Sequence, residues 1–160
     1  LGLIESPTNL PTVLIEVVCE DELVLICAPG HKFAKLKSVT PQQIVGEPYV
    51  SREIGSGTRD FSDNYLRECK VAPEDLNIVM ELGSPVAIKG VVETGLGVSI
   101  VSRAMVAKEL KLRVQVAVLL EPRLIRTLSL VYPREKFRSK LLTTFVEFAT
   151  SRMKQIASAA

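Results

Sequence analysis

The feature that most constrains the fold of this chain is a strand, glycine turn and helix pattern that occurs twice in succession. Residues 49–52 read as a strand, the turn Gly55-Ser56-Gly57-Thr58-Arg59 follows, and a helix then places apolar residues at three- and four-residue spacing. The pattern recurs with a strand over 78–82, the turn Gly83-Ser84-Pro85 and a helix over 86–94 that Gly95 ends. Strands that alternate with helices are typical of helix-covered parallel sheets, so the predicted fold class is α/β with mostly parallel sheets.

The flanking segments supply further strands and helices. Residues 13–18 and the apolar run 23–28 predict two adjacent strands separated by the acidic Glu20-Asp21-Glu22. A capping box at Thr40-Pro41-Gln42-Gln43 predicts a short helix that Gly46 closes. Strands are expected over 98–101, 114–120 and 124–132, and a helix from Ser102 to Leu110. Residues 139–156 predict an amphipathic helix whose apolar residues are Leu141, Leu142, Phe145, Phe148 and Met153.

Composition excludes several classes of protein. The chain has 160 residues, 47% hydrophobic and 24% charged, with a net charge of +2 and no dense basic run, so this segment alone should not bind DNA. No apolar stretch approaches the roughly 20 residues of a membrane span, and no signal segment opens the chain. Three cysteines without CxxC spacing (Cys19, Cys27 and Cys69) favour buried reduced thiols in the cytoplasm over a redox switch or a zinc site. Because the first residue is Leu, the chain is expected to be a fragment.

The two glycine turns are the best candidates for binding a ligand. Each opens a helix at the carboxyl end of a strand, where unpaired N–H groups and the positive end of the helix dipole favour an anion. The alternative is that Ser56 and Ser84 only cap their helices. Arg52 and Arg59 flank the first turn, where they either neutralise an anion or pair with Glu53 and Asp60.

No catalytic or cofactor motif is present. Gly55-Ser56-Gly57-Thr58 lacks the following Lys of a phosphate-binding P-loop, and Gly95-Leu96-Gly97 ends a helix instead of opening one, unlike a dinucleotide fingerprint. The lone His31 lies in a Pro-Gly turn and is expected to be a hinge or surface residue. We therefore expect neither an enzyme nor a cofactor or metal.

The order of motifs resembles the effector-binding domain of LysR-type transcriptional regulators. The resemblance rests on the closing helix and on residues 21–31 (DELVLICAPGH), 52–59 (REIGSGTR) and 91–101 (VVETGLGVSIV). It implies a fold like that of type II periplasmic binding proteins, with two α/β subdomains joined by two crossing strands. Residues 29–126 would form the second subdomain, and residues 1–28 and 127–160 an incomplete first one.

The resemblance also implies a function. A small, anionic metabolite would bind in the cleft between the subdomains, held partly by Ser56, Gly57, Thr58 and Arg59 and partly by Gly83, Ser84 and Pro85. DNA binding would belong to a winged helix-turn-helix absent from this chain, and the protein would form a homodimer or homotetramer. A periplasmic-type solute-binding protein shares the fold and stays an alternative; an enzyme would need an acid, base or metal constellation that this sequence does not supply.

Overall fold

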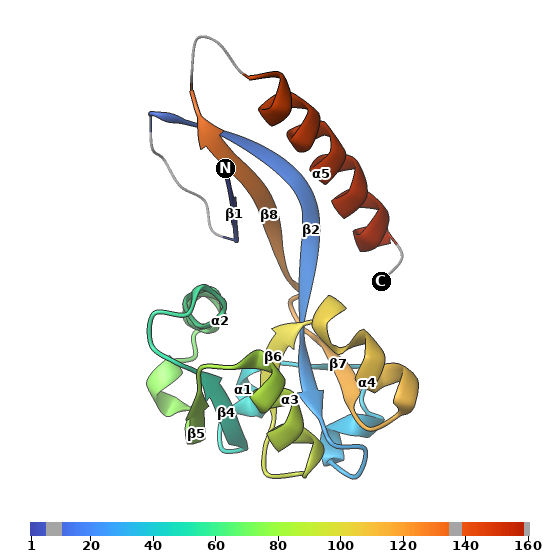
Figure 1. Cartoon of the computed structure of the whole chain (residues 1–160). Helices are drawn as coiled ribbons and strands as arrows, with labels where there is room; N and C mark the ends of the chain where they lie inside the picture. Colours follow the sequence, from blue (N-terminus) through green and yellow to red (C-terminus); the bar gives the residue numbers. More distant parts are fainter. Residues whose placement is uncertain (6–10, 135–138, 159–160) are drawn as a thin grey trace. The chain divides into compact units, whose positions relative to one another are not determined.

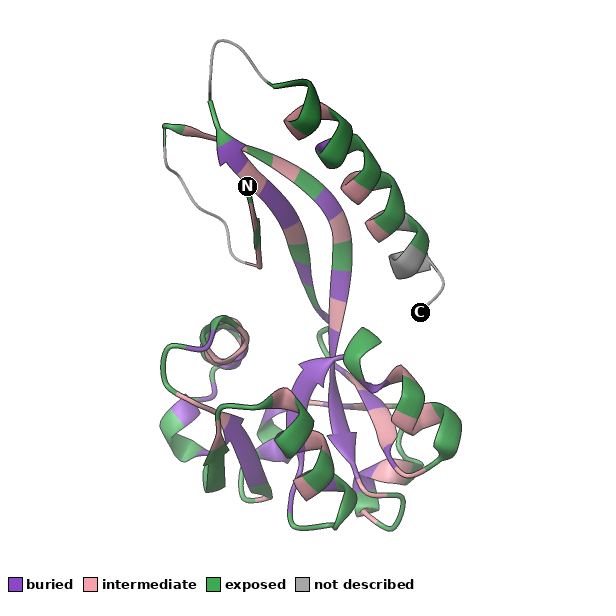
Figure 2. Ribbon diagram, viewed as in Figure 1, coloured by how far each residue is buried: buried purple, intermediate pink, exposed green. Residues whose placement is uncertain are grey.

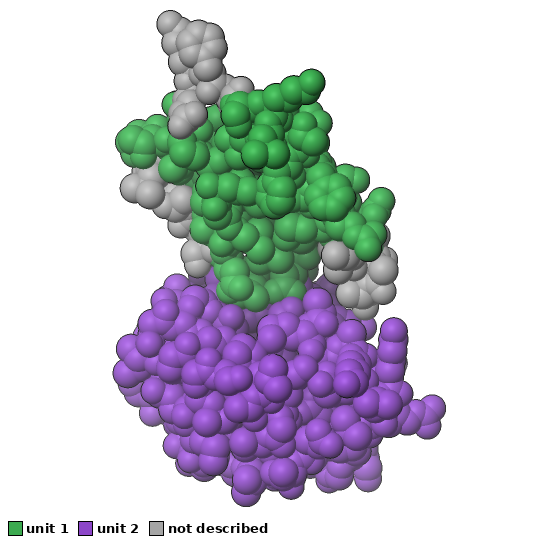
Figure 3. Space-filling view, in the orientation of Figure 1, with its two compact units in different colours: residues 1–21, 125–160 green, residues 22–124 purple. Residues whose placement is uncertain are grey.

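The computed structural model describes residues 1–5, 11–134 and 139–158. The chain divides into two compact units, coloured separately in Figure 3: unit 1 is Leu1–Asp21 with Ile125–Ala160, and unit 2 is Glu22–Leu124. The subdomain bounds drawn from the resemblance, 29–126 against 1–28 with 127–160, stay a prediction. In the described part of the chain, no helix is long and apolar enough to span a membrane.

Unit 1 consists of one small sheet and one long helix. The strand order is β1 (Gly2–Ile4), β8 (Leu124–Pro133) and the first part of β2 (Val13–Cys27), with β1 antiparallel to β8. Helix α5 (Lys140–Ser158) runs along β2 and β8 in Figure 1. Its contacts with the sheet form a core of Val18, Leu130, Tyr132 and Val146.

The buried face of α5 differs from the predicted one. Leu142 and Met153 pack against the core as expected, but with Val146 and Ala149 as their neighbours on the helix. The predicted core residues Leu141, Phe145 and Phe148 are instead exposed. Positions 142, 146, 149 and 153 follow the three- and four-residue spacing of one helix face. The exposed Leu141, Phe145 and Phe148 lie outside this face.

Strand β2 is continuous, whereas the sequence predicted two strands. Two of the three acidic residues, Asp21 and Glu22, have their charges paired, so they do not interrupt the strand. Buried Asp21 accepts hydrogen bonds from Nε (2.9 Å) and Nη2 (2.8 Å) of Arg126, and Glu22 pairs with Arg103 (3.2 Å) and Arg123 (2.7 Å). Paired charges are compatible with an extended strand where isolated ones would favour a solvated turn.

Unit 2 contains the rest of the sheet strands and most of the helices. The second part of β2 pairs antiparallel with β6 (Ser99–Ser102) and β7 (Val116–Leu120), and β7 pairs in parallel with β3 (Ser38–Val39). Strands β4 (Pro48–Arg52) and β5 (Asn77–Leu82) are parallel, and a parallel bridge joins Tyr49 to Val98. The sheets are therefore mixed, since the chain enters the unit along β2 and returns along β7 in the opposite direction.

The first three helices of unit 2 begin and end close to their predicted positions, whereas the helix predicted from Ser102 to Leu110 begins as an α-helix only at Ala107, because Ser102 ends β6 and a 3-10 turn follows it. The α-helices are α1 (Pro41–Ile44), α2 (Gly57–Glu68), α3 (Pro85–Glu93) and α4 (Ala107–Leu112). Short 3-10 turns occupy Lys32–Lys35, Pro73–Asp75 and Ala104–Val106. The capping box of α1 is present, with the Gln43 side chain accepting from the Thr40 N–H at 2.8 Å.

The apolar run of β2 is buried on both faces, as Figure 2 shows for the part of the strand in unit 2. Leu23, Leu25 and Cys27 belong to one hydrophobic cluster, and Val24 and Ile26 belong to another. Successive side chains of a strand point to opposite faces, so a strand covered on both sides needs an unbroken apolar sequence. The prediction of a strand buried on both faces is confirmed.

Candidate ligand-binding site

The pairing of β4 with β5 brings the two glycine turns together. Arg52 at the end of β4 lies opposite Leu82 at the end of β5, so the chain leaves both parallel strands at the same edge. A Cβ atom added to Gly83 would lie 3.9 Å from Cδ of Glu53. The structure thus places the helix starts of α2 and α3 beside each other, at the carboxyl ends of their strands.

Each candidate residue lies at or beside one of these helix starts. Ser56 is the N-cap of α2 and is buried, Gly57 begins the helix, and Thr58 and Arg59 are half-buried in its first turn. Ser84 is the exposed N-cap of α3, and Pro85 is its first residue. Gly55 adopts a φ of 88°, which a glycine tolerates better than other residues, and this turn aims the chain into α2.

The two N-cap serines make different hydrogen bonds. The Ser84 hydroxyl accepts from the N–H of Ala87 at 3.4 Å and so caps its own helix. The Ser56 side chain makes no such bond, although its backbone has the extended conformation of an N-cap. The capping interpretation therefore describes Ser84, whereas the positive end of α2 is not capped by its own serine.

The two arginines beside the first turn are paired with carboxylates. Arg52 donates to both carboxylate oxygens of Glu53, at 2.7 and 2.9 Å. Arg59 pairs with Glu81 at 2.5 Å and more loosely with Asp63 at 3.8 Å, and it donates to the Arg52 carbonyl at 2.8 Å. Of the two interpretations left open by the sequence, pairing with carboxylates describes both arginines, but Arg59 pairs with Asp63, one helical turn further on, and with Glu81 of the neighbouring strand instead of with Asp60.

These charges shift the titration of two carboxyl groups in opposite directions. The Arg52 hydrogen bond holds the pKa of Glu53 below its ordinary value. Burial raises the pKa of Asp63, and the nearby Arg59 only partly opposes that effect. A ligand at this edge would thus meet an ionised carboxylate at Glu53 and a carboxyl group at Asp63 that ionises less readily.

A small polar cavity lies between β4 and the first turns of α2. Its lining includes Ser51, Thr58, Arg59 and Tyr49. Burial raises the pKa of Tyr49 to about 12. Ser62 lines the cavity too, and its hydroxyl is buried without a hydrogen-bond partner in the described part of the chain. Sequence reasoning missed Ser62, although it lies four residues after Thr58 and hence on the same face of α2.

Other reactive side chains lie elsewhere in the fold. The three cysteines are free thiols, and burial raises the pKa of Cys27 to about 11. His31 caps the first 3-10 turn by accepting from Phe33 N–H at 3.2 Å, and its Nε2 lies 3.2 Å from Glu47. Among the described residues, no group of three or more His, Cys, Asp or Glu side chains could hold a metal ion.

Comparisons with known proteins agree with this architecture. The family model described as the LysR substrate binding domain matches residues 1–154. The HTH-type transcriptional regulator YeiE of Escherichia coli strain K12 is 38% identical over 150 residues, which are 92% of this chain and 50% of that protein. A probable RuBisCO transcriptional regulator of Phaeodactylum tricornutum is 33% identical over 95% of this chain and 49% of its own length. The chain spans about half the length of these curated relatives.

Solved structures show the same fold at lower identity. The CcmR regulatory domain of Synechocystis PCC6803 in complex with 2-PG has a TM-score of 0.82 at 22% identity, over 93% of this chain and 71% of that one. The effector-binding domain of QuiR in complex with shikimate has a TM-score of 0.79 at 23% identity, over 96% and 71%. The fold is thus that of LysR regulatory domains, which resemble type II periplasmic binding proteins. The predicted family, of regulators and not of enzymes, is confirmed: the chain belongs to the LysR substrate-binding domain family.

Proposed function

We propose that this chain is the sensing domain of a LysR-type transcriptional regulator, and that it holds a small anionic metabolite at the paired starts of α2 and α3. The observation that carries the proposal is the uncapped α2 start beside the α3 start at one sheet edge. Backbone N–H groups and the dipole of a helix start favour anions without needing a free cation. This matters because both arginines already have carboxylate partners.

The contributions of the individual residues follow from the geometry. The hydroxyls of Ser56 and Thr58 would donate to the ligand, with Gly57 letting it approach the backbone closely. Gly83, Ser84 and Pro85 would form the opposite wall, and Arg59 would exchange part of its contact with Glu81 for the ligand. Ser62 would supply one further hydroxyl from the second turn of α2.

Two solved relatives support a small ligand for this fold, since one is a complex with 2-PG and another with shikimate. In the proposed mechanism, the metabolite binds one conformational state of the sensing domain more tightly than the others and shifts the population toward it. That shift would change how winged helix-turn-helix heads elsewhere in the cytoplasmic protein meet DNA. The relatives are transcriptional regulators, which favours this function over solute binding in the periplasm.

The proposal is tested by thermal unfolding in the presence of sulfate, sulfite, phosphate, phosphoenolpyruvate and simple carboxylates. A ligand at 100 times its dissociation constant should stabilise the chain by about 2.7 kcal/mol, or several degrees in Tm. The double variant Ser56→Ala, Thr58→Ala should abolish the shift. Thr94→Ala, which removes an exposed hydroxyl at the end of α3, serves as the matched control. Loss of the shift in the control as well would contradict the assignment of the site.

We further propose that two copies of the chain associate through the outer edge of β5. Within the described residues, β5 pairs only with β4, and its residues Ile78, Val79 and Met80 are exposed together with Val86 of α3. An exposed, apolar strand edge favours pairing with another chain.

Replacing Val79 with Lys should place a charge in that edge and lower the dimer fraction measured by sedimentation. Leu36→Lys, which charges a similarly exposed apolar residue away from β5, should leave the dimer fraction unchanged. An equal dimer fraction in Val79→Lys and in the native chain would rule out this edge.

A further inference from the structure

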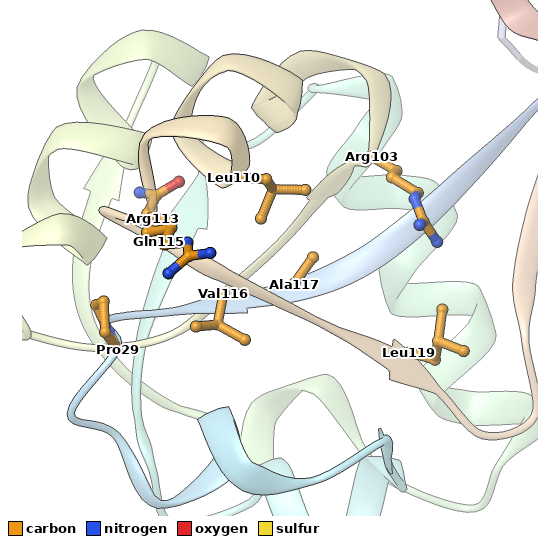
Figure 4. Close-up of a pocket in the computed structure, with 8 residues that line it drawn as sticks. All are labelled: Pro29, Arg103, Leu110, Arg113, Gln115, Val116, Ala117 and Leu119. Atoms are coloured by element: carbon orange, nitrogen blue, oxygen red, sulfur yellow. The ribbon is translucent and has the colours of Figure 1, made fainter. Parts of the chain in front are cut away.

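A second cavity lies within unit 2, away from the paired helix starts. It has a volume of about 530 Å³ and lies between α4 and β7. Figure 4 shows Leu110 of α4 over Ala117 of β7, with Arg113 and Gln115 at one end and with Arg103 and Leu119 at the other. This volume falls in the range of about 300–1,000 Å³ that is typical of small-molecule sites.

The cavity floor is apolar. Leu110, Ala117 and Leu119 are partly buried and pack against the hydrophobic cluster that contains Val24 and Ile26 of β2. They are therefore held by the core and not by solvent-exposed loops. An apolar floor of this kind accepts an aliphatic or aromatic body and rejects a fully polar ligand.

Gln115, which lines one end of the cavity, has an unused hydrogen-bond acceptor. Gln115 is 2% exposed, and its Nε2 donates to the Lys89 carbonyl at 2.5 Å. Its Oε1 has no hydrogen-bond partner in the described part of the chain. A buried acceptor without a partner costs on the order of 1–3 kcal/mol, so a donor that reached it would bind favourably.

The same end carries an unpaired cation. Arg113 is exposed and makes no ion pair with a carboxylate among the described residues, whereas Arg103 at the far end is engaged by Glu22. The nearest acid along α4, Glu109, is already held by Lys89 at 2.8 Å. Arg113 also ends α4 in a left-handed conformation with a φ of 57°, which fixes where its side chain begins.

We propose that this cavity binds an apolar 2-amino or 2-hydroxy carboxylic acid. Its carboxylate would pair with the Arg113 guanidinium, the adjacent amino or hydroxyl group would donate to Gln115 Oε1, and its side chain would lie on Leu110, Ala117 and Leu119. Arg113 and Gln115 line the same end of the cavity, which suits a ligand whose acid and donor groups sit on neighbouring carbons. The site would give the sensing domain a second ligand, independent of the one at α2 and α3.

The test uses four related molecules, with binding followed by NMR chemical shifts and calorimetry on the whole chain. Leucine and 2-hydroxy-4-methylpentanoate carry all three groups, 4-methylpentanoate lacks the donor, and leucinamide lacks the carboxylate. At least one of the first two should bind about tenfold to a hundredfold more tightly than the last two. Which of those two binds more tightly decides between an amino and a hydroxy acid.

Variants identify the residues. Arg113→Gln should weaken binding by a similar factor, and Lys111→Gln, an equal loss of charge at an exposed position of α4, should not. Three results would overturn the proposal. They are equal weakening by both variants, an affinity for 4-methylpentanoate equal to that for leucine and 2-hydroxy-4-methylpentanoate, and no binding of any of the four molecules at 10 mM (about −2.7 kcal/mol). The double variant Ser56→Ala, Thr58→Ala should retain binding here, so failure of the proposed effector site is distinguishable from failure of this one.

Discussion

The starts of α2 and α3 have similar sequences, but the hydroxyls of their N-cap serines differ in hydrogen bonding. Both follow a parallel strand, both have a serine at the N-cap, and both lie at one sheet edge. Ser84 is exposed and satisfies its own helix, whereas Ser56 is buried and does not. The comparison teaches that a serine before a helix is not by itself a cap or a ligand site. The role of such a serine depends on whether its hydroxyl accepts a hydrogen bond from its own helix.

The strands that carry the two turns are also held differently. β4 pairs with β5 on one side and contacts Val98 on the other, through Val50 N–H to Val98 O and Val98 N–H to Pro48 O, both at 2.9 Å. Gly97 makes this approach possible, because a Cβ atom there would lie 2.6 Å from the Pro48 carbonyl oxygen. The turn that contains Ser56 therefore follows a strand that has hydrogen-bonded neighbours on both sides.

The largest expected effect comes from breaking that support. Gly97→Ala should lower the free energy of unfolding by about 1–3 kcal/mol, since backbone atoms must move to admit the methyl group. Gly90→Ala, in α3 with nothing within 4 Å of the added atom, should instead raise it by roughly 0.5–1 kcal/mol. Urea unfolding of both variants measures the difference, and equal values would show that β4 does not need the close contact.

A middle-sized effect separates the two serines. Ser84→Ala should cost about 1 kcal/mol of stability because it removes a helix cap. Ser56→Ala should cost clearly less in the absence of ligand, since its side chain makes no capping bond. Chemical unfolding of the two single variants under identical conditions sharpens the contrast; a greater loss for Ser56→Ala would reverse it.

The smallest effect is on the pH dependence of stability around the first turn. The folded pKa of Asp63 is raised, so its contribution to stability falls as pH rises above its ordinary value of 3.8. The folded pKa of Glu53 is lowered, so its contribution is present above 4.5 and is lost as pH falls through the lower folded value. Between pH 3 and 7, the stability of Asp63→Asn relative to the native chain should therefore rise with pH, and that of Glu53→Gln should fall. Parallel pH profiles would contradict these assignments.

Local patterns predicted most of the fold. Helix starts at Ser56 and Ser84, the short helix after Thr40 and the doubly buried run of β2 follow from capping residues and apolar spacing, which act over a few residues. The errors concern partners distant in sequence. The charge pair of Asp21 with Arg126 keeps β2 continuous, and packing of α5 against the sheet of unit 1 selects Val146 over Phe145. Neither choice is visible in a short window of sequence.

The candidate site was predictable only in part. Its glycine and serine residues stand out because turns and helix starts have characteristic composition. The partners of Arg59 could not be predicted, because Glu81 comes from another strand and is adjacent only after β4 and β5 pair. Likewise, the unpartnered hydroxyl of Ser62 is a property of the packed interior and not of its sequence neighbours.

The paired charges of β2 have a consequence for how substitutions combine. Asp21 and Glu22 are neighbours in the chain, yet Asp21 binds Arg126 within unit 1, and Glu22 binds Arg103 and Arg123 within unit 2. Because these ion pairs involve different arginines, the effects on stability of substituting Asp21 and Glu22 should be close to additive even though a single peptide bond joins the two residues. A substitution at either residue is therefore expected to alter the charge pairing of one unit and to leave that of the other unit unchanged.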